Sequence, residues 1–310
     1  MAIDVVVYVS SVANPKKHTR KIACLESFAA GVAHTGHRVH TEWAHKYRPS
    51  RLAVMLGWAT TNTGGNNITL RKEIIAQQHK MGFKTMCIDS SCWKYVDTDS
   101  NYLRYSLGGP FYDRGEYANN NSNSSKWLEI KQALNVELQL PQTTHLGPIL
   151  ICMQRDGGFA MKTLNPLQWL STKIQEIRRY SQRQIVIRPH PGDYNPKNFV
   201  QYQRQSGITV VDPLTTQLMD NLNGAHAAVF FNSSASVAAV LAGVAVFADD
   251  SSCVAWKVAN QDISKIESPE TFAREQWLYD LAAAHWSDAD ARSGRVWQKF
   301  LPYLASTTTS

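Results

Sequence analysis

Two short segments of the chain combine residues that can hold a phosphate group. In the first, the apolar run 185–187 ends directly in Arg188-Pro189-His190-Pro191. The prolines fix φ and remove backbone donors beside His190, so its imidazole is held at a strand end, where it can bind or protonate a phosphate together with Arg188. A structural loop with a hydrogen-bonded histidine is the alternative. In the second segment, an apolar run leads into Asn232-Ser233-Ser234. Such residues cap helices, and the hydroxyls and N–H groups at a helix start also bind anions.

A third segment follows the apolar run 148–152 and contains Gln154, Arg155 and Gly157. The guanidinium of Arg155 can neutralise a phosphate, and Gly157 allows a close approach of the backbone to a ligand. A plain surface turn explains the same residues.

Asp89 is the first candidate for a general base, because it follows the apolar run 85–88 and a carboxylate there can accept the proton of a hydroxyl. Capping of the next residues explains Asp89 equally well. Asp113 and His18 are reserve candidates.

The elements that must position these residues alternate between short apolar strands and amphipathic helices. Strands are expected at 3–9, 38–43, 52–56, 84–88, 148–152, 184–187, 208–211, 227–230 and 244–247, and helices at 18–34, 67–81, 166–181, 196–205, 215–222, 234–242, 275–285 and 288–304. Residues 97–125 show no period and are expected to form a long loop. This pattern predicts an α/β fold of two Rossmann-like domains facing across a cleft, with ligands at the carboxyl ends of the strands.

The predicted borders give a domain at 1–142, a second at 143–285, and a C-terminal helix at 286–310 that packs back across the junction. Charge divides along the first border. The chain has 32 Lys+Arg and 25 Asp+Glu, and the first 142 residues hold 17 basic and 11 acidic residues, a balance of 17 − 11 = +6. The rest holds 15 and 14, or +1. A basic surface can bind a polyanion, although a solvated basic face is the alternative. The candidates for such contacts are Lys16, Lys17, His18, Arg20, Arg48, Arg51 and Arg104.

Other classes of site find no support in the sequence. The five cysteines form no CxxC pair, so no metal is expected, and neither GxGxxG nor a Walker sequence is present. No apolar run approaches the ~20 residues of a membrane span. The N-terminus has no basic segment of a signal peptide, which predicts a cytoplasmic protein.

The order strand–RPHP, then strand–NSS–helix–Gly–strand, resembles the two-domain glycosyltransferases of the GT-B type. It is particularly similar to the capsular-polysaccharide and teichoic-acid glycerophosphotransferase branch and to glycosyltransferases of tailed bacteriophages. The phage proteins are also similar in LGWATTNTGGNNITLRKEII (56–75), NYLRYSLGG (101–109) and GPILICMQRDGGFAM (147–161). The resemblance implies that the first domain holds the acceptor and that the second binds a nucleotide-sugar, taken as a UDP-sugar, without a protein-bound metal or other cofactor. It further implies that Arg188 and His190 contact the donor diphosphate, and that Ser233 and Ser234 hold phosphate oxygens.

The leading functional hypothesis is a phage-type glycosyltransferase that adds a sugar to 5-hydroxymethylpyrimidine in double-stranded DNA, in the cytoplasm of an infected bacterium. The basic first domain then positions DNA phosphates. One alternative is a surface-polysaccharide glycosyl- or glycerophosphotransferase. A second alternative is a nucleotide-sugar-binding module without catalysis.

Overall fold

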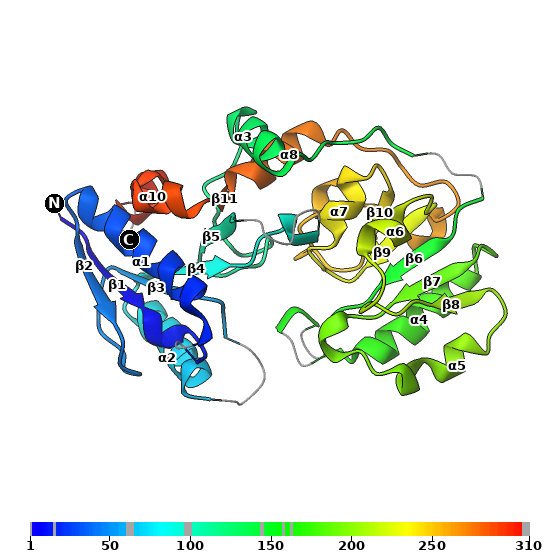
Figure 1. The fold of residues 1–310 in the computed structure, drawn as a ribbon, viewed down its shortest axis with the longest axis horizontal. Helices are drawn as coiled ribbons and strands as arrows, with labels where there is room; N and C mark the ends of the chain where they lie inside the picture. The colour runs from blue at the N-terminus through cyan, green and yellow to red at the C-terminus, as the bar shows by residue number, and fades with distance from the viewer. Residues whose placement is uncertain are drawn as a thin grey trace. The chain divides into compact units, whose positions relative to one another are not determined.

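The chain folds into two compact units, each with its own sheet (Figure 1). The computed structural model describes residues 2–14, 17–59, 65–95, 101–142, 146–156, 159–161 and 164–305, so the predicted site residues Lys16 and Gly157 lie outside the described part. The first unit comprises Met1–Lys94, Asp99–Trp127 and Tyr279–Ser310, and the second comprises Tyr95–Thr98 and Leu128–Leu278.

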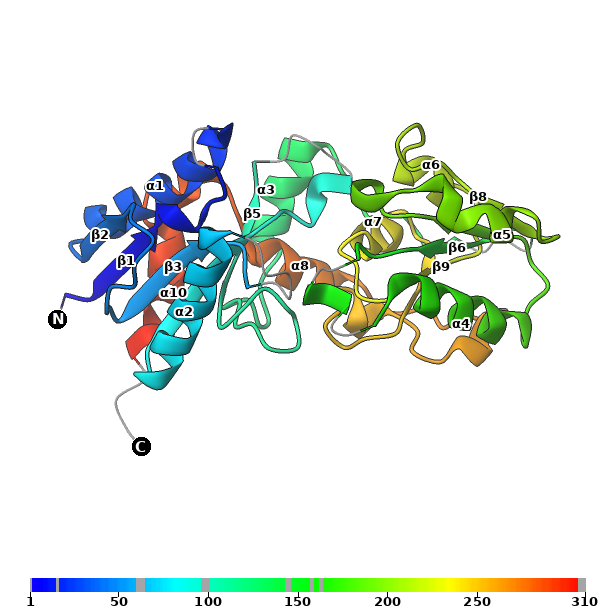
Figure 2. The same cartoon turned by 90° about the horizontal axis from the view of Figure 1, so that it is seen from below.

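The first unit contains a six-stranded sheet in the order β11-β5-β4-β3-β1-β2. Strands β1 (Asp4–Tyr8), β2 (Arg38–Glu42), β3 (Leu52–Leu56) and β4 (Lys84–Asp89) are parallel, whereas β5 (Leu103–Leu107) runs antiparallel to both β4 and β11 (His285–Trp286). Helices α1 (Thr19–His34), α9 (Asp288–Arg292) and α10 (Arg295–Ala305) share one apolar core with this sheet, and α2 (Asn66–Lys80) covers the other face (Figure 2). Strands β1 and β3, inside the sheet, are nearly continuous apolar runs because helices cover both faces.

The second unit contains a five-stranded parallel sheet in the order β10-β9-β6-β7-β8. Its strands are β6 (Ile149–Cys152), β7 (Ile185–Arg188), β8 (Ile208–Val210), β9 (Ala227–Phe230) and β10 (Ala245–Ala248). Its helices are α4 (Pro166–Arg178), α5 (Val200–Gln203), α6 (Leu218–Leu222) and α7 (Ser236–Leu241). Helices α3 (Ser125–Leu134) and α8 (Glu275–Ala283) each include a border between the units.

The predicted α/β class is confirmed, and several elements and the division into units differ from what the sequence predicts. The segment expected to be a loop contains β5, and α3 begins at its end. The last expected helix is divided into α9 and α10 at Gly294, which has φ +85°. The division into units also differs from the predicted borders, because 128–142 joins the second unit and 279–310 returns to the first. There β11 completes the sheet and α10 packs on α1, since their apolar faces share the core of that unit.

Gly31 sets the distance between α1 and α9. A Cβ at this position would lie 1.9 Å from the backbone oxygen of Ala291. We therefore expect Gly31→Ala to lower the free energy of unfolding by roughly 1–3 kcal/mol, because overpacking outweighs the better helix propensity of alanine. Urea unfolding followed by tryptophan fluorescence measures the change. Ala33→Ser, which adds one atom at an exposed position of the same helix, is the control. Equal stability of Gly31→Ala and the control would contradict the prediction.

Candidate functional site

The predicted site residues of the second unit gather where the order of its strands reverses. From β6 the chain proceeds to β7 and β8 on one side, and then returns to place β9 and β10 on the other. The carboxyl ends of neighbouring β6 and β9 therefore form a topological switch point, where ligands bind in open α/β sheets. Gln154 follows β6, Asn232 follows β9, and His190 follows β7, so all three lie at this edge.

A hydrogen-bond network joins two of these residues across the switch point. Gln154 Nε2 donates to Asn232 Oδ1 over 2.6 Å, and Asn232 Nδ2 donates to Ala160 O and to Ser252 Oγ, each over 2.8 Å. The Ser252 hydroxyl in turn donates to Asp250. Asn232 is only 8% exposed and is bonded at both ends of its amide. The structure therefore gives Asn232 the role of positioning Gln154, rather than the predicted direct contact with the donor.

Sequence reasoning did not place Ser252 and Asp250 in the site. The available signal was their position directly after β10, at the same edge as Asn232.

His190 is oriented by the turn that follows β7. Its Nδ1 accepts a hydrogen bond of 3.0 Å from the N–H of Gly192, so the proton of the neutral ring lies on Nε2. Together with Gln154 and Asp156, His190 lines a cavity of about 140 Å³. The exposed Arg155 is adjacent, because a Cβ on Gly192 would lie 3.7 Å from its Cδ. One edge thus brings together a neutral donor, a cation and an amide.

Gly192 leaves room for this histidine. A Cβ there would lie 3.1 Å from both Nδ1 and Cε1 of His190. If this edge binds the donor, Gly192→Ala is expected to lower the turnover number by about tenfold or more, because small displacements of a catalytic group are costly. Steady-state kinetics measures this change, and the melting temperature serves as the control for folding. Wild-type turnover in a folded Gly192→Ala variant would contradict the prediction.

Arg188 is directed away from the predicted role. Its guanidinium donates to Thr216 Oγ1 over 2.8 Å, to Asn221 Oδ1 over 2.7 Å and to Thr216 O over 2.9 Å. Burial lowers the pKa of Arg188 from its ordinary value. The predicted contact with a diphosphate is therefore corrected: the Nη groups of Arg188 are bonded to Thr216, in the segment after β8, and to Asn221 in α6.

The serines after β9 separate into two roles. Ser233 is 5% exposed, and its Oγ accepts a hydrogen bond of 3.2 Å from Ala235 N. This hydroxyl stabilises the turn before α7, whereas the N-cap of α7 is Ala235 and no side chain makes a capping hydrogen bond there, so Ser233 does not act as the cap that the alternative expected. Ser234 is half-buried and stays a candidate for contact with phosphate.

Asp89 and Arg104, predicted for two different tasks, form an ion pair in the first unit. The antiparallel register places them opposite each other, and Arg104 Nη2 lies 2.5 Å from Asp89 Oδ2. Arg104 also donates to Ser90 O and is 8% exposed. A buried, paired guanidinium is not available to a DNA phosphate, so the surface role predicted for Arg104 is corrected. The side chain of Asp89 is 29% exposed. Its partner is Arg104, so the alternative that Asp89 caps the residues after it does not explain the position of this carboxylate.

The reserve candidates are not part of this pair. Asp113 forms a 3.4 Å ion pair with its neighbour Arg114. His18 stands at the N-cap of α1, where its side chain makes no capping hydrogen bond.

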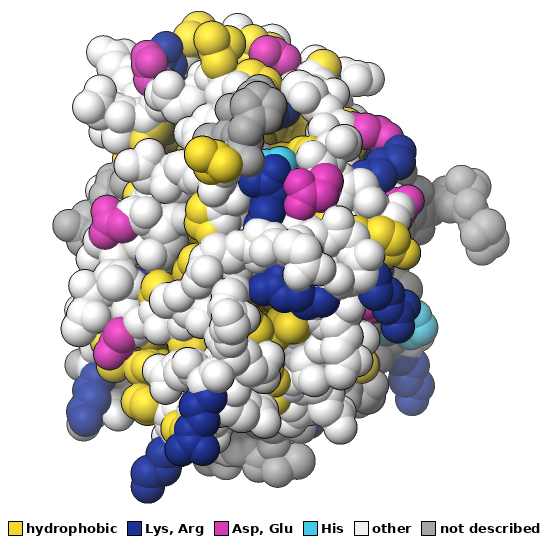
Figure 3. All heavy atoms as spheres, turned by 90° about the vertical axis from the view of Figure 1, so that its right-hand side faces the viewer, with side chains coloured by type: hydrophobic (Ala, Val, Ile, Leu, Met, Phe, Trp, Pro, Cys, Tyr) yellow, Lys and Arg dark blue, Asp and Glu magenta, His cyan; other side chains and the backbone are white. Residues whose placement is uncertain are grey.

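The remaining basic residues predicted for DNA lie at both edges of the first sheet. Lys17, His18 and Arg20 follow β1 at the carboxyl edge, whereas Arg51 precedes β3 at the amino edge. Arg48 is paired with Glu42 over 3.4 Å. The structure therefore divides the predicted set: Lys17, His18 and Arg20 lie at one edge of the sheet and Arg51 at the other. In the second unit, the face drawn in Figure 3 shows Lys and Arg scattered among acidic and uncharged side chains, in keeping with its balanced charge.

Thiol and metal chemistry find no site in the described part of the chain. All five cysteines are buried and none is in a disulfide with another described residue, and burial raises the pKa of Cys152, at the end of β6, to about 12. This thiol is therefore protonated at neutral pH and is no nucleophile. Among the described residues no cluster of His, Cys, Asp and Glu suited to a metal ion is found. Nor does the described part contain a helix that is long and apolar enough to cross a membrane.

Comparison with solved structures identifies the fold. No known protein family matches the sequence, and no curated protein matches it. The β Kdo 2,7 transferase of KpsC from Thermosulfurimonas dismutans is similar over 96% of this chain and 100% of that chain, with 12% identity and a TM-score of 0.56. The β Kdo 2,4 transferase of the same protein is similar over 91% and 90%, with 10% identity and a TM-score of 0.55. The UDP-GlcNAc 2-epimerase of Methanocaldococcus jannaschii covers 98% and 100% at 10% identity, but its TM-score of 0.34 carries no argument.

These likenesses show a fold of the GT-B glycosyltransferase type with two Rossmann-like units, as the sequence predicts. At such low identity they show the fold alone.

Proposed function

We propose that the protein is a glycosyltransferase that binds a nucleotide-sugar at the carboxyl edge of the sheet in the second unit. The observation that carries this proposal is the meeting of Gln154 and His190 at the carboxyl edge of that sheet, where both line a cavity of about 140 Å³ and Arg155 lies beside the turn at Gly192. The shared fold with two Kdo transferases supports it.

Glycosyl transfer from a nucleotide-sugar requires groups that stabilise the leaving phosphate. When the bond between the sugar and the nucleotide breaks, negative charge builds on the leaving phosphate. The Nε2–H of His190 and the guanidinium of Arg155 are placed to stabilise this charge. Ser234 is a further candidate for contact with a phosphate oxygen. UDP is the nucleotide that we propose to test first.

The acceptor hydroxyl must lose a proton as it attacks the sugar. We propose Asp89 for this step, because its carboxylate lies at the carboxyl edge of the first sheet and is partly exposed. Its Oδ2 is bonded to Arg104, so Oδ1 is the oxygen that we assign to the acceptor.

We propose that the acceptor is a hydroxyl of a saccharide rather than a hydroxyl on a DNA base. The two structural neighbours with TM-scores above 0.5 are named as Kdo transferases. The basic residues that motivated DNA are divided between two edges, and Arg104 is buried.

The decisive experiment offers the protein a panel of nucleotide-sugars, including UDP- and CMP-sugars, and analyses released nucleotide and product by mass spectrometry. Each donor is tested with saccharide acceptors and with duplex DNA that carries 5-hydroxymethylcytosine or 5-hydroxymethyluracil. Transfer to a saccharide supports the proposal. Binding of a nucleotide-sugar without turnover on any acceptor would favour the non-catalytic module.

One observation still favours DNA as the acceptor. Lys17, His18 and Arg20 are close together in the sequence and follow β1 at its carboxyl edge. If DNA binds there, its affinity falls steeply with salt because bound cations are released. The double substitution Lys17→Ala/Arg20→Ala then weakens duplex binding without changing donor binding. Electrophoretic mobility shifts at several salt concentrations measure the salt dependence of duplex binding and its loss in the double variant. An absence of salt-dependent duplex binding excludes DNA as the acceptor.

A further inference from the structure

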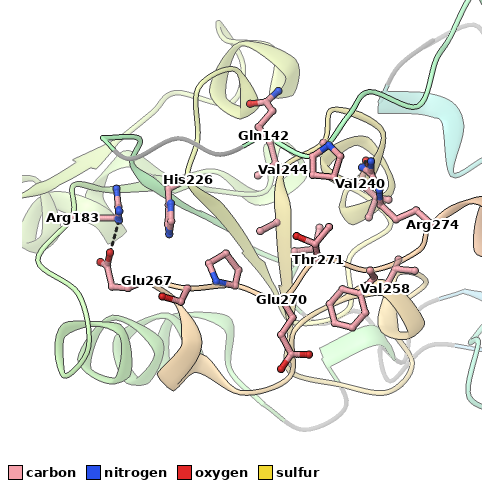
Figure 4. Close-up of a pocket in the computed structure, with 17 residues that line it drawn as sticks. Gln142, Arg183, His226, Val240, Val244, Val258, Glu267, Glu270, Thr271 and Arg274 are labelled. Carbon is pink, nitrogen blue, oxygen red and sulfur yellow. Dashed lines mark hydrogen bonds and ion pairs between the residues drawn. The ribbon is translucent and has the colours of Figure 1, made fainter.

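A second cavity lies at the opposite edge of the sheet in the second unit (Figure 4). Its volume is about 250 Å³. The lining includes Arg183, His226 and Val244, which precede β7, β9 and β10, and the segment 267–272. Because these strands are parallel, this is the amino edge, remote from the residues that we assign to the donor.

One end of this cavity is polar. Arg183 Nε lies 2.9 Å from Glu267 Oε2, and His226 is only 8% exposed. His226 Nε2 lies 2.7 Å from Ile266 O, and since a carbonyl can only accept, Nε2 is the donor of this hydrogen bond. Figure 4 shows Arg183, Glu267 and His226 together at this end. The guanidinium–carboxylate pair thus places strong donors and acceptors next to each other.

The other end is walled by apolar side chains. Val240 and Val258 line it together with Phe272. Arg274 also reaches this end, but its guanidinium donates to Val240 O over 2.8 Å and to Gln139 O over 2.7 Å. Val240 belongs to the last turn of α7, and its carbonyl also accepts a hydrogen bond of 3.1 Å from Gly243 N. The charge of Arg274 is therefore satisfied by the fold.

The charges around the cavity balance. The lining holds two cations, Arg183 and Arg274, and two carboxylates, Glu267 and Glu270, and Arg183 and Glu267 form an ion pair. A lining without excess positive charge is a poor match for a nucleotide or a phosphate, which basic clusters attract.

A pyranose fits both ends of such a cavity. Its hydroxyls donate and accept side by side, as the pair of Arg183 and Glu267 requires, and the C–H face of its ring is apolar. Pockets for drug-sized ligands span about 300–1,000 Å³. The smaller volume of about 250 Å³ suits one sugar unit rather than a chain.

We propose that this cavity binds one uncharged monosaccharide unit, with its hydroxyls at Arg183 and Glu267 and its C–H face toward Val258 and Phe272. The proposal goes beyond the glycosyl transfer proposed above and does not depend on it, because the residues of the two sites are different.

Saturation-transfer NMR and calorimetry with a panel of methyl glycosides of neutral hexoses and N-acetylhexosamines test this site. Thr271 lies between the two ends of the cavity in Figure 4, and Thr271→Trp fills the space. Thr69→Trp, at an exposed position of α2, is the matched control, and His190→Ala alters only the carboxyl edge. Melting temperatures verify that each variant is folded.

We expect at least one methyl glycoside to bind the wild type, Thr69→Trp and His190→Ala alike, and to bind Thr271→Trp at least about tenfold more weakly. Four results would overturn the proposal. These are no glycoside binding, undiminished binding to folded Thr271→Trp, loss of binding in His190→Ala, or displacement of the glycoside by inorganic phosphate or UDP. Loss of glycosyl transfer in His190→Ala with glycoside binding intact separates this site from the proposed donor site.

Discussion

Replacing His190 with alanine is expected to lower the rate of glycosyl transfer by about 10²–10³-fold, the usual cost of removing one donor that stabilises developing negative charge. The ring is held with Nδ1 on the N–H of Gly192, so its Nε2–H is the group that alanine removes. The stability of the protein is expected to change little, because His190 is only half-buried and its Nδ1 is bonded to the N–H of Gly192 in the adjacent turn.

The replacement His190→Gln sharpens this experiment. The amide nitrogen of glutamine reaches about as far as Nε2 and is also a neutral donor. We therefore expect it to recover part of the rate that alanine loses. His79→Ala, at an exposed position of α2, is the matched control and is expected to retain full activity. Wild-type turnover in His190→Ala would remove His190 from the mechanism and leave Arg155 as the charge that stabilises the leaving group.

The parallel cores of both units could be predicted from the sequence because each buried strand is a short apolar run. Strands such as β1 (Asp4–Tyr8) and β6 (Ile149–Cys152) have helices on both faces, and this arrangement leaves few polar residues in them. The switch-point site follows from the same pattern, since Gln154, His190 and Asn232 each come after one of these runs.

Strand β5 could not be recognised in the same way. In Leu103–Leu107, the polar residues Arg104 and Ser106 alternate with apolar ones, and Gly and Asn residues surround the segment. Both polar residues are buried, because the Arg104 guanidinium reaches Asp89 and the Ser106 hydroxyl donates to Gly109 O. Because the sequence pattern does not reveal β5, it does not show that Asp89 and Arg104 lie opposite each other, and it suggests a separate role for each residue.

Arg188 shows a second limit of sequence reasoning. Its partners Thr216 and Asn221 are 28 and 33 residues away and belong to the segment that follows β8. An arginine at a strand end has the same sequence pattern whether it faces a ligand or a neighbouring loop. Which of the two the arginine faces depends on contacts with residues distant in the sequence, and the local sequence pattern does not show them.

The return of the C-terminal segment to the first unit depends on a similar long-range contact. The Lys126 ammonium at the start of α3 lies 2.6 Å from the carboxylate of Asp290 in α9, and their side chains are only 8% and 4% exposed. Ser287 N and Oγ donate to the same carboxylate over 3.0 and 2.9 Å, and Arg295 is bonded to it as well. Asp290 therefore satisfies several donors at once.

Asp290→Ala is expected to lower the free energy of unfolding of the first unit by about 3–5 kcal/mol, because it leaves the buried ammonium without its counter-charge. Urea unfolding followed by the fluorescence of the tryptophans of this unit measures the loss. Asp4→Ala is the matched control, since Asp4 pairs with Arg38 over the same 2.6 Å but both side chains are more than half exposed. Solvent screens that pair, so we expect a small effect. Adding Lys126→Met to Asp290→Ala is expected to restore part of the stability, because no unpaired charge is then buried. Equal losses in Asp290→Ala and Asp4→Ala would contradict this account.

The pH dependence of stability gives an independent test of the same pair. Burial acts to raise the pKa of Asp290, but the hydrogen bonds from Lys126 and Ser287 outweigh it and hold the pKa below its ordinary value of 3.8. A depressed folded-state pKa contributes stability that is fully present at neutral pH and is lost as the pH falls below 3.8 toward the folded-state value. The difference in stability between the wild type and Asp290→Ala is therefore expected to be constant from pH 7 to about pH 5 and to shrink in stronger acid. A difference that grows as the pH falls would mean that the protonated carboxyl, and not the ion pair, stabilises the return of α9 to the first unit.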